Sequence, residues 1–164
     1  MNGNDVELIR DVREELNGIE IWINNGNNRT DKKVKYLISY SVIKASGTVE
    51  MIFKRMLYEE LSQRATKENK IYLQNKIVES SCNPDTGNIS RLLQDMSNEW
   101  KCKFEKLVKN EAQKQKSELN SLVQWRNDFA HGGSITTSIR SVKKSFEAGI
   151  VILKILDRIL KGEE

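Results

Sequence analysis

The sequence has little proline, cysteine or histidine, and each shortage argues against a class of protein. One proline and nine glycines in 164 residues leave few turn signals, which argues against an all-β sandwich or barrel. The thiols of Cys82 and Cys102 and the ring of His131 are too few to build a zinc site within one chain, because such a site takes three or four ligands. We therefore expect no metal and no cofactor.

Long apolar runs are missing as well. No window approaches the ~18 apolar residues of a membrane span. The N-terminal stretch MNGNDVELIRDVREEL is acidic and lacks the apolar core of a secretory signal. With 38% hydrophobic and 30% charged residues, the chain can still bury a core. We expect one domain over residues 1–164, away from membranes and in the cytoplasm with reduced thiols, although the cysteine spacing leaves a disulfide open.

The net charge of +4 is unevenly spread along the chain. Residues 1–20 carry two arginines against six acidic residues, so all of the basic excess lies further on. It gathers in residues 32–35, in residues 101–116 and at Arg140, Lys143 and Lys144. This pattern suits a polyanionic partner, but solvated helix faces would produce it too.

Apolar residues recur at steps of three and four almost throughout, which is the spacing of amphipathic helices. The pattern predicts helices over about 6–23, 33–64, 68–79, 88–107, 119–130 and 139–160, with loops at NNGNNRTD (24–31) and SSCNPDTGN (80–88). Asn88 or the residues before it are expected to cap the fourth helix. Gly47 marks either a weak point in the second helix or close packing against a neighbour. The polar segment 109–118 is either an exposed helical stretch or a break. The predicted fold is all-α, an antiparallel bundle of about five helices.

The segment WRNDFAHGG (125–133) departs from a purely structural helix. At 100° per residue, Arg126 falls in the middle of the arc that carries the apolar residues, where an arginine needs an anion or several acceptors. Asn127 and His131 are four residues apart, so they share a face and can hydrogen-bond. Gly132 and Gly133 suit a helix C-cap.

Histidine exchanges protons near neutral pH, and an arginine beside it can stabilise a phosphate. Arg126, Asn127 and His131 are therefore our candidates for proton transfer and phosphate stabilisation, although a histidine at a helix end is often only a cap residue. Glu50 is a weaker candidate, either orienting Arg126 or lying exposed on its helix. We expect Asp128 to be solvated.

Three tryptophans are also candidates for contacts with bases. Trp22, Trp100 and Trp125 are nevertheless more typical of packing than of base stacking, because most tryptophans are largely buried.

RNDFAHGG resembles the signature of the HEPN superfamily, in which an arginine and a polar residue are followed by a histidine four to six positions after the arginine. Arg126, Asn127 and His131 occupy these places. The segment SGTVEMIFKRM resembles the family's second helix, and residues 134–160 resemble the helix that follows the motif. The resemblance implies a small helical domain. Many such domains are metal-independent endoribonucleases of toxin–antitoxin, abortive-infection and other phage-defence systems.

The resemblance also implies that a second copy of the chain completes the site. Family members usually act as homodimers whose motifs face each other across a basic cleft. Geometry agrees, because Arg126 and His131 are about 140° and ~7.5 Å apart on an ideal helix, too far for one chain to aim both at one phosphorus easily.

Toxins paired with a nucleotidyltransferase antitoxin carry a modified tyrosine two positions after the histidine. Here that position is Gly133, which makes this form of regulation doubtful.

The first hypothesis is an endoribonuclease that cleaves RNA by attack of the 2′-hydroxyl. In it His131 acts as general base or acid, Arg126 stabilises the charge on phosphorus, and Asn127 orients His131 or the phosphate. Arg140, Lys143 and Lys144 would bind the RNA backbone. The alternatives are a non-catalytic dimerisation or RNA-binding module of a defence complex, and an antitoxin-like partner protein whose acidic first helix neutralises another protein.

Overall fold

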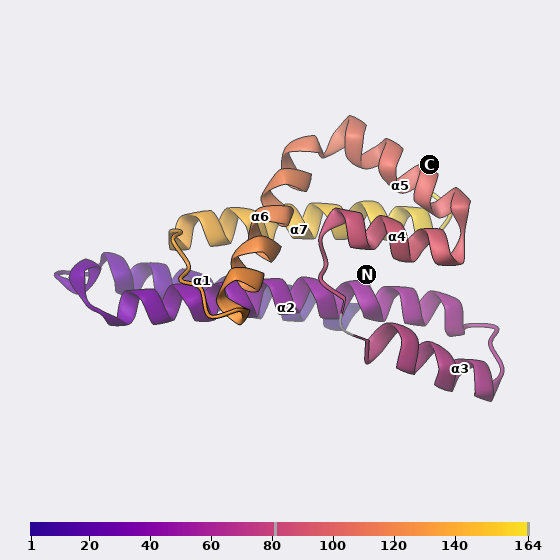
Figure 1. The fold of residues 1–164 in the computed structure, drawn as a ribbon, viewed down its shortest axis with the longest axis horizontal. Helices are drawn as coiled ribbons and strands as arrows, with labels where there is room; N and C mark the ends of the chain where they lie inside the picture. The colour runs from indigo at the N-terminus through magenta and orange to yellow at the C-terminus, as the bar shows by residue number, and fades with distance from the viewer. Residues whose placement is uncertain (81, 164) are drawn as a thin grey trace.

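The repeat of apolar residues produces helices along almost the whole chain. The computed structural model describes residues 1–80 and 82–163 (Figure 1). They form α1 (Gly3–Asn24), α2 (Lys33–Ser62), α3 (Lys67–Leu73), α4 (Thr86–Met96), α5 (Asn98–Glu111), α6 (Gln113–Ala130) and α7 (Ile139–Leu160). A 3-10 turn covers Asn28–Thr30 and a π-helical turn covers Gln74–Val78, and this part of the chain has no strand. The all-α prediction is confirmed. Ser81, placed in a loop by the sequence, and Glu164 lie outside the described residues.

Polar side chains begin several of these helices. At α1, the side chain of Asn2 accepts from the backbone N–H of Asp5 at 2.9 Å, and the Asp5 carboxylate accepts from the Asn2 N–H at 2.8 Å. This capping box satisfies two donors that the helix itself leaves unpaired. At α4 and α7 the cap is a single hydrogen bond, which the side chain of Asp85 accepts from the Asn88 N–H and that of Ser138 accepts from the Ser141 N–H. The cap of α4 is thus one of the residues before Asn88, one of the two options that the sequence left open.

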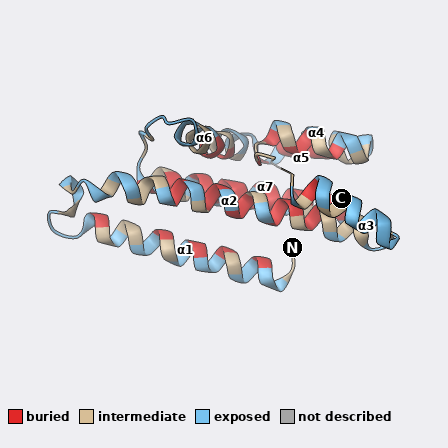
Figure 2. Ribbon diagram, turned by 60° about the horizontal axis from the view of Figure 1, so that its bottom comes forward, coloured by how far each residue is buried: buried red, intermediate tan, exposed pale blue. Residues whose placement is uncertain are grey.

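The central helix is α7, of whose 22 residues 13 are buried. It packs against α1, α2, α5 and α6, and Figure 2 shows buried residues concentrated on α2 and α7. α1 runs antiparallel to both, because Asp5 near its start pairs with Arg55 near the end of α2, and Glu20 near its end pairs with Arg140 at the start of α7. α2 and α7 consequently run in the same direction, as the colours of Figure 1 show.

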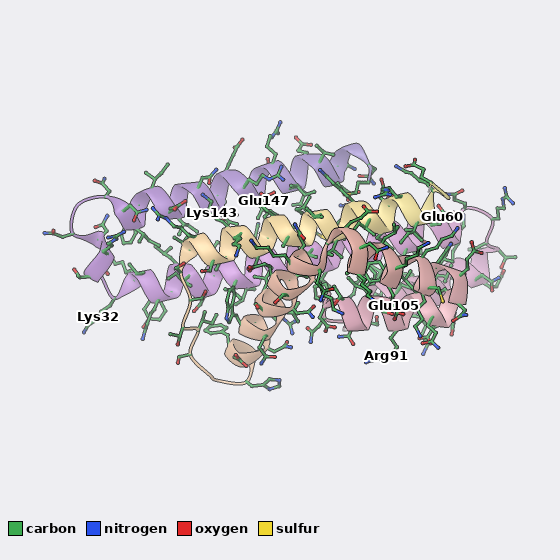
Figure 3. The ribbon with its side chains drawn as sticks, turned by 90° about the horizontal axis from the view of Figure 1, so that it is seen from above. Lys32, Glu60, Arg91, Glu105, Lys143 and Glu147 are labelled. Atoms are coloured by element: carbon green, nitrogen blue, oxygen red, sulfur yellow. The ribbon has the colours of Figure 1, made fainter. Side chains whose placement is uncertain are left out.

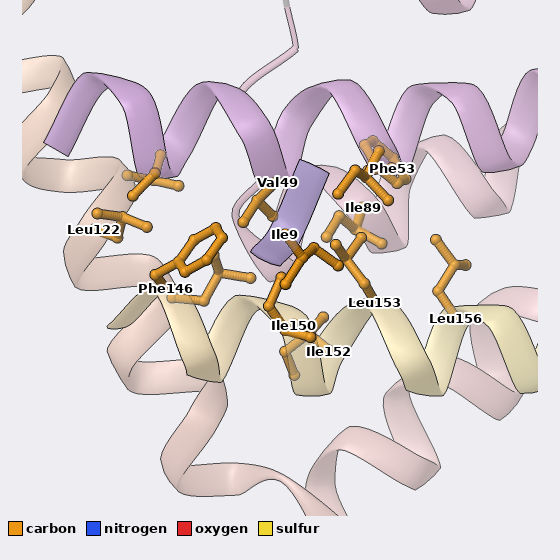
Figure 4. Close-up of a cluster of buried hydrophobic side chains, with 14 of the residues drawn as sticks. Ile9, Val49, Phe53, Ile89, Leu122, Phe146, Ile150, Ile152, Leu153 and Leu156 are labelled. Carbon is orange, nitrogen blue, oxygen red and sulfur yellow. The ribbon is translucent and has the colours of Figure 1, made fainter. Parts of the chain in front are cut away.

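The core forms around α7 from buried side chains of α1, α2, α4, α5 and α6, and Figure 4 shows some of these side chains. Phe53, Phe146 and Leu122 are completely buried there. A Cβ atom at Gly149 would lie 2.8 Å from Cγ2 of Val49 and 3.4 Å from Cδ1 of Leu119. Glycine at this position therefore allows α7 to approach α2 and α6 closely, a requirement that the periodicity of the sequence did not reveal.

The described chain has seven α-helices rather than about five. Six helical ranges were expected from the sequence, and one of them is divided. The helix expected over 88–107 is divided at Ser97, whose φ of −157° is extended and whose side chain accepts from the Trp100 N–H to begin α5. The polar segment 109–118 contains a break at Ala112, which has φ −140° and is fully buried. Helical segments on both sides of that break are mostly exposed, so both options for this segment hold in part.

Gly47 neither interrupts α2 nor packs closely. α2 is continuous from Lys33 to Ser62, and a Cβ atom at Gly47 would meet nothing within 4 Å. Both expectations for this residue were wrong, because its side of α2 is uncovered in the chain. None of the helices in the described ranges is long and apolar enough to cross a membrane.

Candidate functional site

The candidate motif lies at the C-terminal end of α6. Leu119, Leu122 and Val123 bury this helix against its neighbours, while Phe129 is 40% exposed and Ala130 is exposed too. The buried arc expected from the sequence therefore ends before the last turn. Figure 3 shows the reason, since the C-terminal end of α6 extends away from α2 and α7 at the edge of the bundle. The motif is thus presented at the edge of the molecule.

Two glycines end α6 in the geometry that a Schellman cap requires. The N–H of Gly132 donates to the carbonyl of Phe129 at 3.1 Å, and the N–H of Gly133 donates to that of Asp128 at 2.8 Å. Gly132 has φ +82°, a conformation that costs other residues free energy. A Cβ atom at Gly133 would lie 2.7 Å from the Asp128 carbonyl oxygen. The predicted glycine C-cap is confirmed, and it fixes the path of the chain just after His131.

Arg126 is half-buried and held by amide oxygens. Its Nη1 donates to Oδ1 of Asn83 at 3.0 Å and to Oδ1 of Asn127 at 3.3 Å. The prediction that this arginine needs acceptors is confirmed. Sequence reasoning missed Asn83, which comes from the loop before α4, 43 residues away. The Asn-Pro pair at 83–84 was a turn signal, but it did not tell which residue the turn would meet.

The loop carrying Asn83 is attached to α6 at a second place. Oδ1 of Asn120 accepts from the backbone N–H of Thr86 at 3.1 Å and from its hydroxyl at 3.2 Å. Asn120 and Arg126 are both on α6, so the helix holds the loop at two points. This arrangement positions the Asn83 amide beside the guanidinium.

The expected hydrogen bond between the side chains of Asn127 and His131 is absent. Oδ1 of Asn127 accepts from Arg126 instead, and the backbone N–H of His131 donates to the Asn127 carbonyl at 3.0 Å. His131 is the exposed C-cap residue of α6, and its ring has no hydrogen bond to the residues that the structure describes. Asn127 therefore positions Arg126, and it does not orient the imidazole within one chain.

Arg126 and His131 do not contact each other, as the helical geometry predicted. No hydrogen bond joins them within the described ranges, and one side chain is half-buried while the other is exposed. Nε and Nη2 of Arg126 likewise have no partner among the described residues. The guanidinium thus keeps two nitrogen donors available for a ligand.

Glu50 does not orient Arg126, and it is not exposed either. Its carboxylate pairs with Lys54 at 2.5 Å, and both side chains are largely buried. Lys54 also donates to the backbone carbonyl of Ser80. Glu50 therefore neutralises a buried lysine that holds the end of the π-helical turn. Nearby, burial raises the pKa of the Cys82 thiol, and both cysteines are free.

The three basic residues proposed to bind RNA are engaged in ion pairs. Arg140 and Lys143 contact the carboxylate of Glu20 on α1 at 3.0 and 2.5 Å. Lys144 pairs with Glu118 of α6. Hydrogen bonds from Lys143 and then Arg140 lower the pKa of Glu20, so that the acid stays charged to a lower pH than an ordinary glutamate. RNA that contacts these cations would compete with the carboxylates that already pair with them.

The remaining sequence candidates lie as expected. Trp22, Trp100 and Trp125 are partly buried and pack against the core. Asp128 is exposed and accepts a hydrogen bond from Gln124 at 2.6 Å. No group of three or more His, Cys, Asp or Glu side chains that could hold a metal ion occurs in the described part of the chain.

One known protein family matches this chain over almost its whole length. The sequence model of the family described as RiboL-PSP-HEPN matches residues 7–162, which is nearly the full chain and includes the motif on α6. Neither a curated protein nor a solved structure matches the chain.

Proposed function

The chain belongs to the HEPN family of helical domains, and from this membership and the Arg126 site we propose that it is a metal-independent endoribonuclease of the toxin–antitoxin or phage-defence type. The observation that carries the proposal is the half-buried guanidinium of Arg126. Two amide oxygens hold one of its nitrogens, while the other two have no partner in the described structure. A guanidinium held in this way is suited to two parallel hydrogen bonds with phosphate oxygens.

The chemistry follows from what RNA itself supplies. The 2′-hydroxyl lies next to the phosphorus and needs only to lose its proton. In the proposed reaction the 2′-oxygen forms a bond to phosphorus, the bond from phosphorus to the 5′-oxygen breaks, and that oxygen takes up a proton. One histidine accepts the first proton or donates the second. The products are a 2′,3′-cyclic phosphate and a free 5′-hydroxyl.

The role of each residue follows from its environment. His131 lies exposed on the last turn, where its ring is open to a substrate proton. Arg126 stabilises the charge on the non-bridging oxygens, and a donor of this kind contributes about 3–4 kcal/mol in a dry site. Asn127, together with Asn83, fixes the position of Arg126.

We further propose that the working species is a homodimer. Arg126 and His131 do not converge within one chain, so a single copy leaves the phosphate site incomplete. A two-fold axis beside the end of α6 would bring the arginine of one protomer towards the histidine of the other. The exposed side chain of Phe129, three residues after Arg126 and two before His131, supplies apolar area for such a contact.

One observation favours the alternative of a non-catalytic RNA-binding or dimerisation module. General bases are usually oriented by a third group, and the His131 ring has no such partner among the described residues. The alternative therefore predicts RNA binding without cleavage.

The two functions are separated by incubating the purified protein with total RNA, with and without EDTA. We expect cleavage in both conditions, and a loss of at least 100-fold for His131→Ala. Asp128→Asn is the matched control, because Asp128 is exposed on the same turn of α6 and should change the rate less than twofold. Intact RNA after incubation with the wild-type protein would contradict the nuclease proposal.

A further inference from the structure

A broad groove lies between α4, α5 and α6, away from the α7 residues first expected to bind RNA. It has a volume of about 1020 Å³. Its walls include the N-terminal turn of α4, the length of α5 and the first half of α6. Asn120, which ties α6 to the loop beside Arg126, is one of its lining residues. The groove therefore adjoins the elements that hold the candidate site.

Four cations line this groove, namely Arg91, Lys101, Lys109 and Lys116. None of them has an ion pair in the described parts of the chain. Arg91 donates only to the side chain of Asn88, at 3.0 Å. These four side chains therefore remain available to an anionic ligand without the breaking of an ion pair.

The two acids that line the groove, Asp85 and Glu105, reduce its formal charge to +2, but neither forms an ion pair with the four cations. Asp85 accepts from the backbone and side chain of Asn88, at 2.9 and 2.6 Å, as the cap of α4. Glu105 accepts from the hydroxyl of Ser90 at 2.5 Å. Both carboxylates are thus held by neighbouring helix residues, and the groove keeps its positive character.

The cations at the start of α7 differ from those of the groove in their ion pairing. Arg140, Lys143 and Lys144 are all paired with carboxylates. Figure 3 shows Lys143 on the side of the molecule that faces α1, and Arg91 and Glu105 on the opposite side with α4 and α5. A polyanion meets free cations in the groove but occupied ones on α7. Free cations bind more strongly, because no existing ion pair has to be broken.

The lining of the groove fits a nucleic acid backbone better than a protein partner. Protein interfaces rely on apolar or aromatic anchors. The apolar residues here, Phe104 and Val108, are only 1% and 3% exposed. Apart from Gly87, the rest of the lining is polar and carries more cations than acids, as is usual for surfaces that contact phosphates. With no exposed aromatic ring for stacking, the groove would contact phosphates rather than bases.

The groove also leads to the motif. On a regular helix Gln113, Lys116, Asn120, Asn127 and His131 fall within about 60° of one another. The first three line the groove, and the last two belong to the candidate site. Lys116 and His131 are ~22 Å apart along α6. A strand that follows this face of α6 out of the groove therefore arrives at His131.

We propose that the groove between α4, α5 and α6 is the site where single-stranded RNA binds through its phosphates and is led along α6 to His131. This inference rests on the proposed ribonuclease function and names the binding surface for its substrate. It implies binding with little dependence on base sequence.

The test measures binding of a labelled 20-nucleotide single-stranded RNA of mixed sequence to the His131→Ala protein over a series of salt concentrations. The groove variant carries, in this background, three substitutions at exposed residues: Arg91→Gln, Lys109→Gln and Lys116→Gln. We expect the Kd near 0.1 M salt to rise about 10- to 100-fold, and the slope of log K against log salt to fall by about 2, or about 0.7 for each lost phosphate contact.

Two triple variants with the same change in net charge are the controls. The first control removes three exposed lysines outside the groove, by Lys67→Gln, Lys70→Gln and Lys76→Gln. The second removes the paired cations of α7, by Arg140→Gln, Lys143→Gln and Lys144→Gln. Both should change the slope by less than half as much as the groove variant. Equal effects of all three triples, or the largest effect from the α7 triple, would overturn the proposal. Thermal unfolding of each variant confirms that it is folded.

Failure of this inference is distinguishable from failure of the nuclease proposal. If the groove variant loses binding but the wild-type protein cuts no RNA, the groove stands and the nuclease does not. If the otherwise wild-type protein carrying the groove substitutions binds and cuts RNA normally, the nuclease stands and the groove does not. Binding of polyglutamate in place of RNA would assign the groove to an acidic protein and overturn the proposal.

Discussion

The guanidinium of Arg126 depends on residues from two elements for its position. Asn127 is its neighbour on α6, but Asn83 comes from the loop before α4. From the sequence one could foresee that this arginine needs acceptors, because it follows the apolar stripe of its helix. The identity of the distant acceptor could not be foreseen, because it depends on how the loop of residues 82–85 packs on α6.

Substitutions at these residues should separate chemistry from positioning. Arg126→Lys keeps the charge but loses the planar pair of donors, so we expect the cleavage rate to fall about 100-fold or more. Asn83→Ala removes one acceptor and leaves the guanidinium intact, and we expect a smaller loss, about 3- to 10-fold. Single-turnover rates on one RNA substrate measure both. Equal rates for Arg126→Lys and the wild-type protein would remove Arg126 from the site.

At the scale of the element, the end of α6 and the middle of α2 show that glycines have different roles. The sequence indicated the cap at Gly132 and Gly133, because two glycines after an apolar pattern commonly end a helix. It did not distinguish the crowded Gly149 from the uncovered Gly47. That difference depends on which helices cross at each point, and periodicity within one helix does not contain this information.

Alanine substitutions should therefore have opposite signs at two glycines. Gly133→Ala forces its Cβ against the Asp128 carbonyl oxygen, and we expect a loss of about 1–2 kcal/mol in unfolding free energy. Gly47→Ala lies mid-helix with nothing within 4 Å, so a gain of about 0.5–1 kcal/mol is expected. Each kcal/mol shifts the Tm of a chain of this size by roughly 2–4 °C, which calorimetry resolves. A stabilised Gly133→Ala protein would show that the cap is not strained by a side chain.

The contact between α1 and α7 predicts a dependence of stability on pH. Hydrogen bonds from Lys143 and Arg140 hold the pKa of Glu20 below its ordinary value of 4.5 in the folded protein. The stabilisation is therefore fully present above about pH 4.5 and is lost as the pH falls through the lower, folded value. Glu20→Gln should be less stable than the wild-type protein at pH 7, and the difference should shrink towards pH 3. A difference that does not vary between these pH values would contradict the role of Glu20.

At the scale of the whole molecule, the uneven charge of the sequence has a structural explanation. The acidic first helix lies along the basic start of α7, so Glu20 pairs with both Arg140 and Lys143. The sequence showed both charged regions but not their pairing, because 120 residues separate Glu20 from Arg140. The all-α class and the motif helix could be predicted from local periodicity. The free cations of the groove could be identified only once the ion pairs were known.

The proposed dimer is testable by mixing two inactive proteins. Arg126→Ala and His131→Ala each remove one half of the composite site. In a mixed dimer, the intact Arg126 of one protomer can meet the intact His131 of the other, so cleavage should return to about a quarter to a half of the wild-type rate, in proportion to the mixed dimers formed. No recovery, with exchange of protomers shown by mass spectrometry, would mean that each chain carries a complete site.

The central claim is that this chain cuts RNA through the RNA's own 2′-hydroxyl, and the most direct measurement compares three substrates of one sequence. An RNA oligonucleotide, its 2′-O-methyl counterpart and the matching DNA are incubated with the wild-type protein in EDTA, and the product ends are identified by mass spectrometry. The account predicts cleavage of the RNA alone, leaving a 2′,3′-cyclic phosphate. Cleavage of the DNA or of the 2′-O-methyl strand, or a requirement for magnesium, would contradict it.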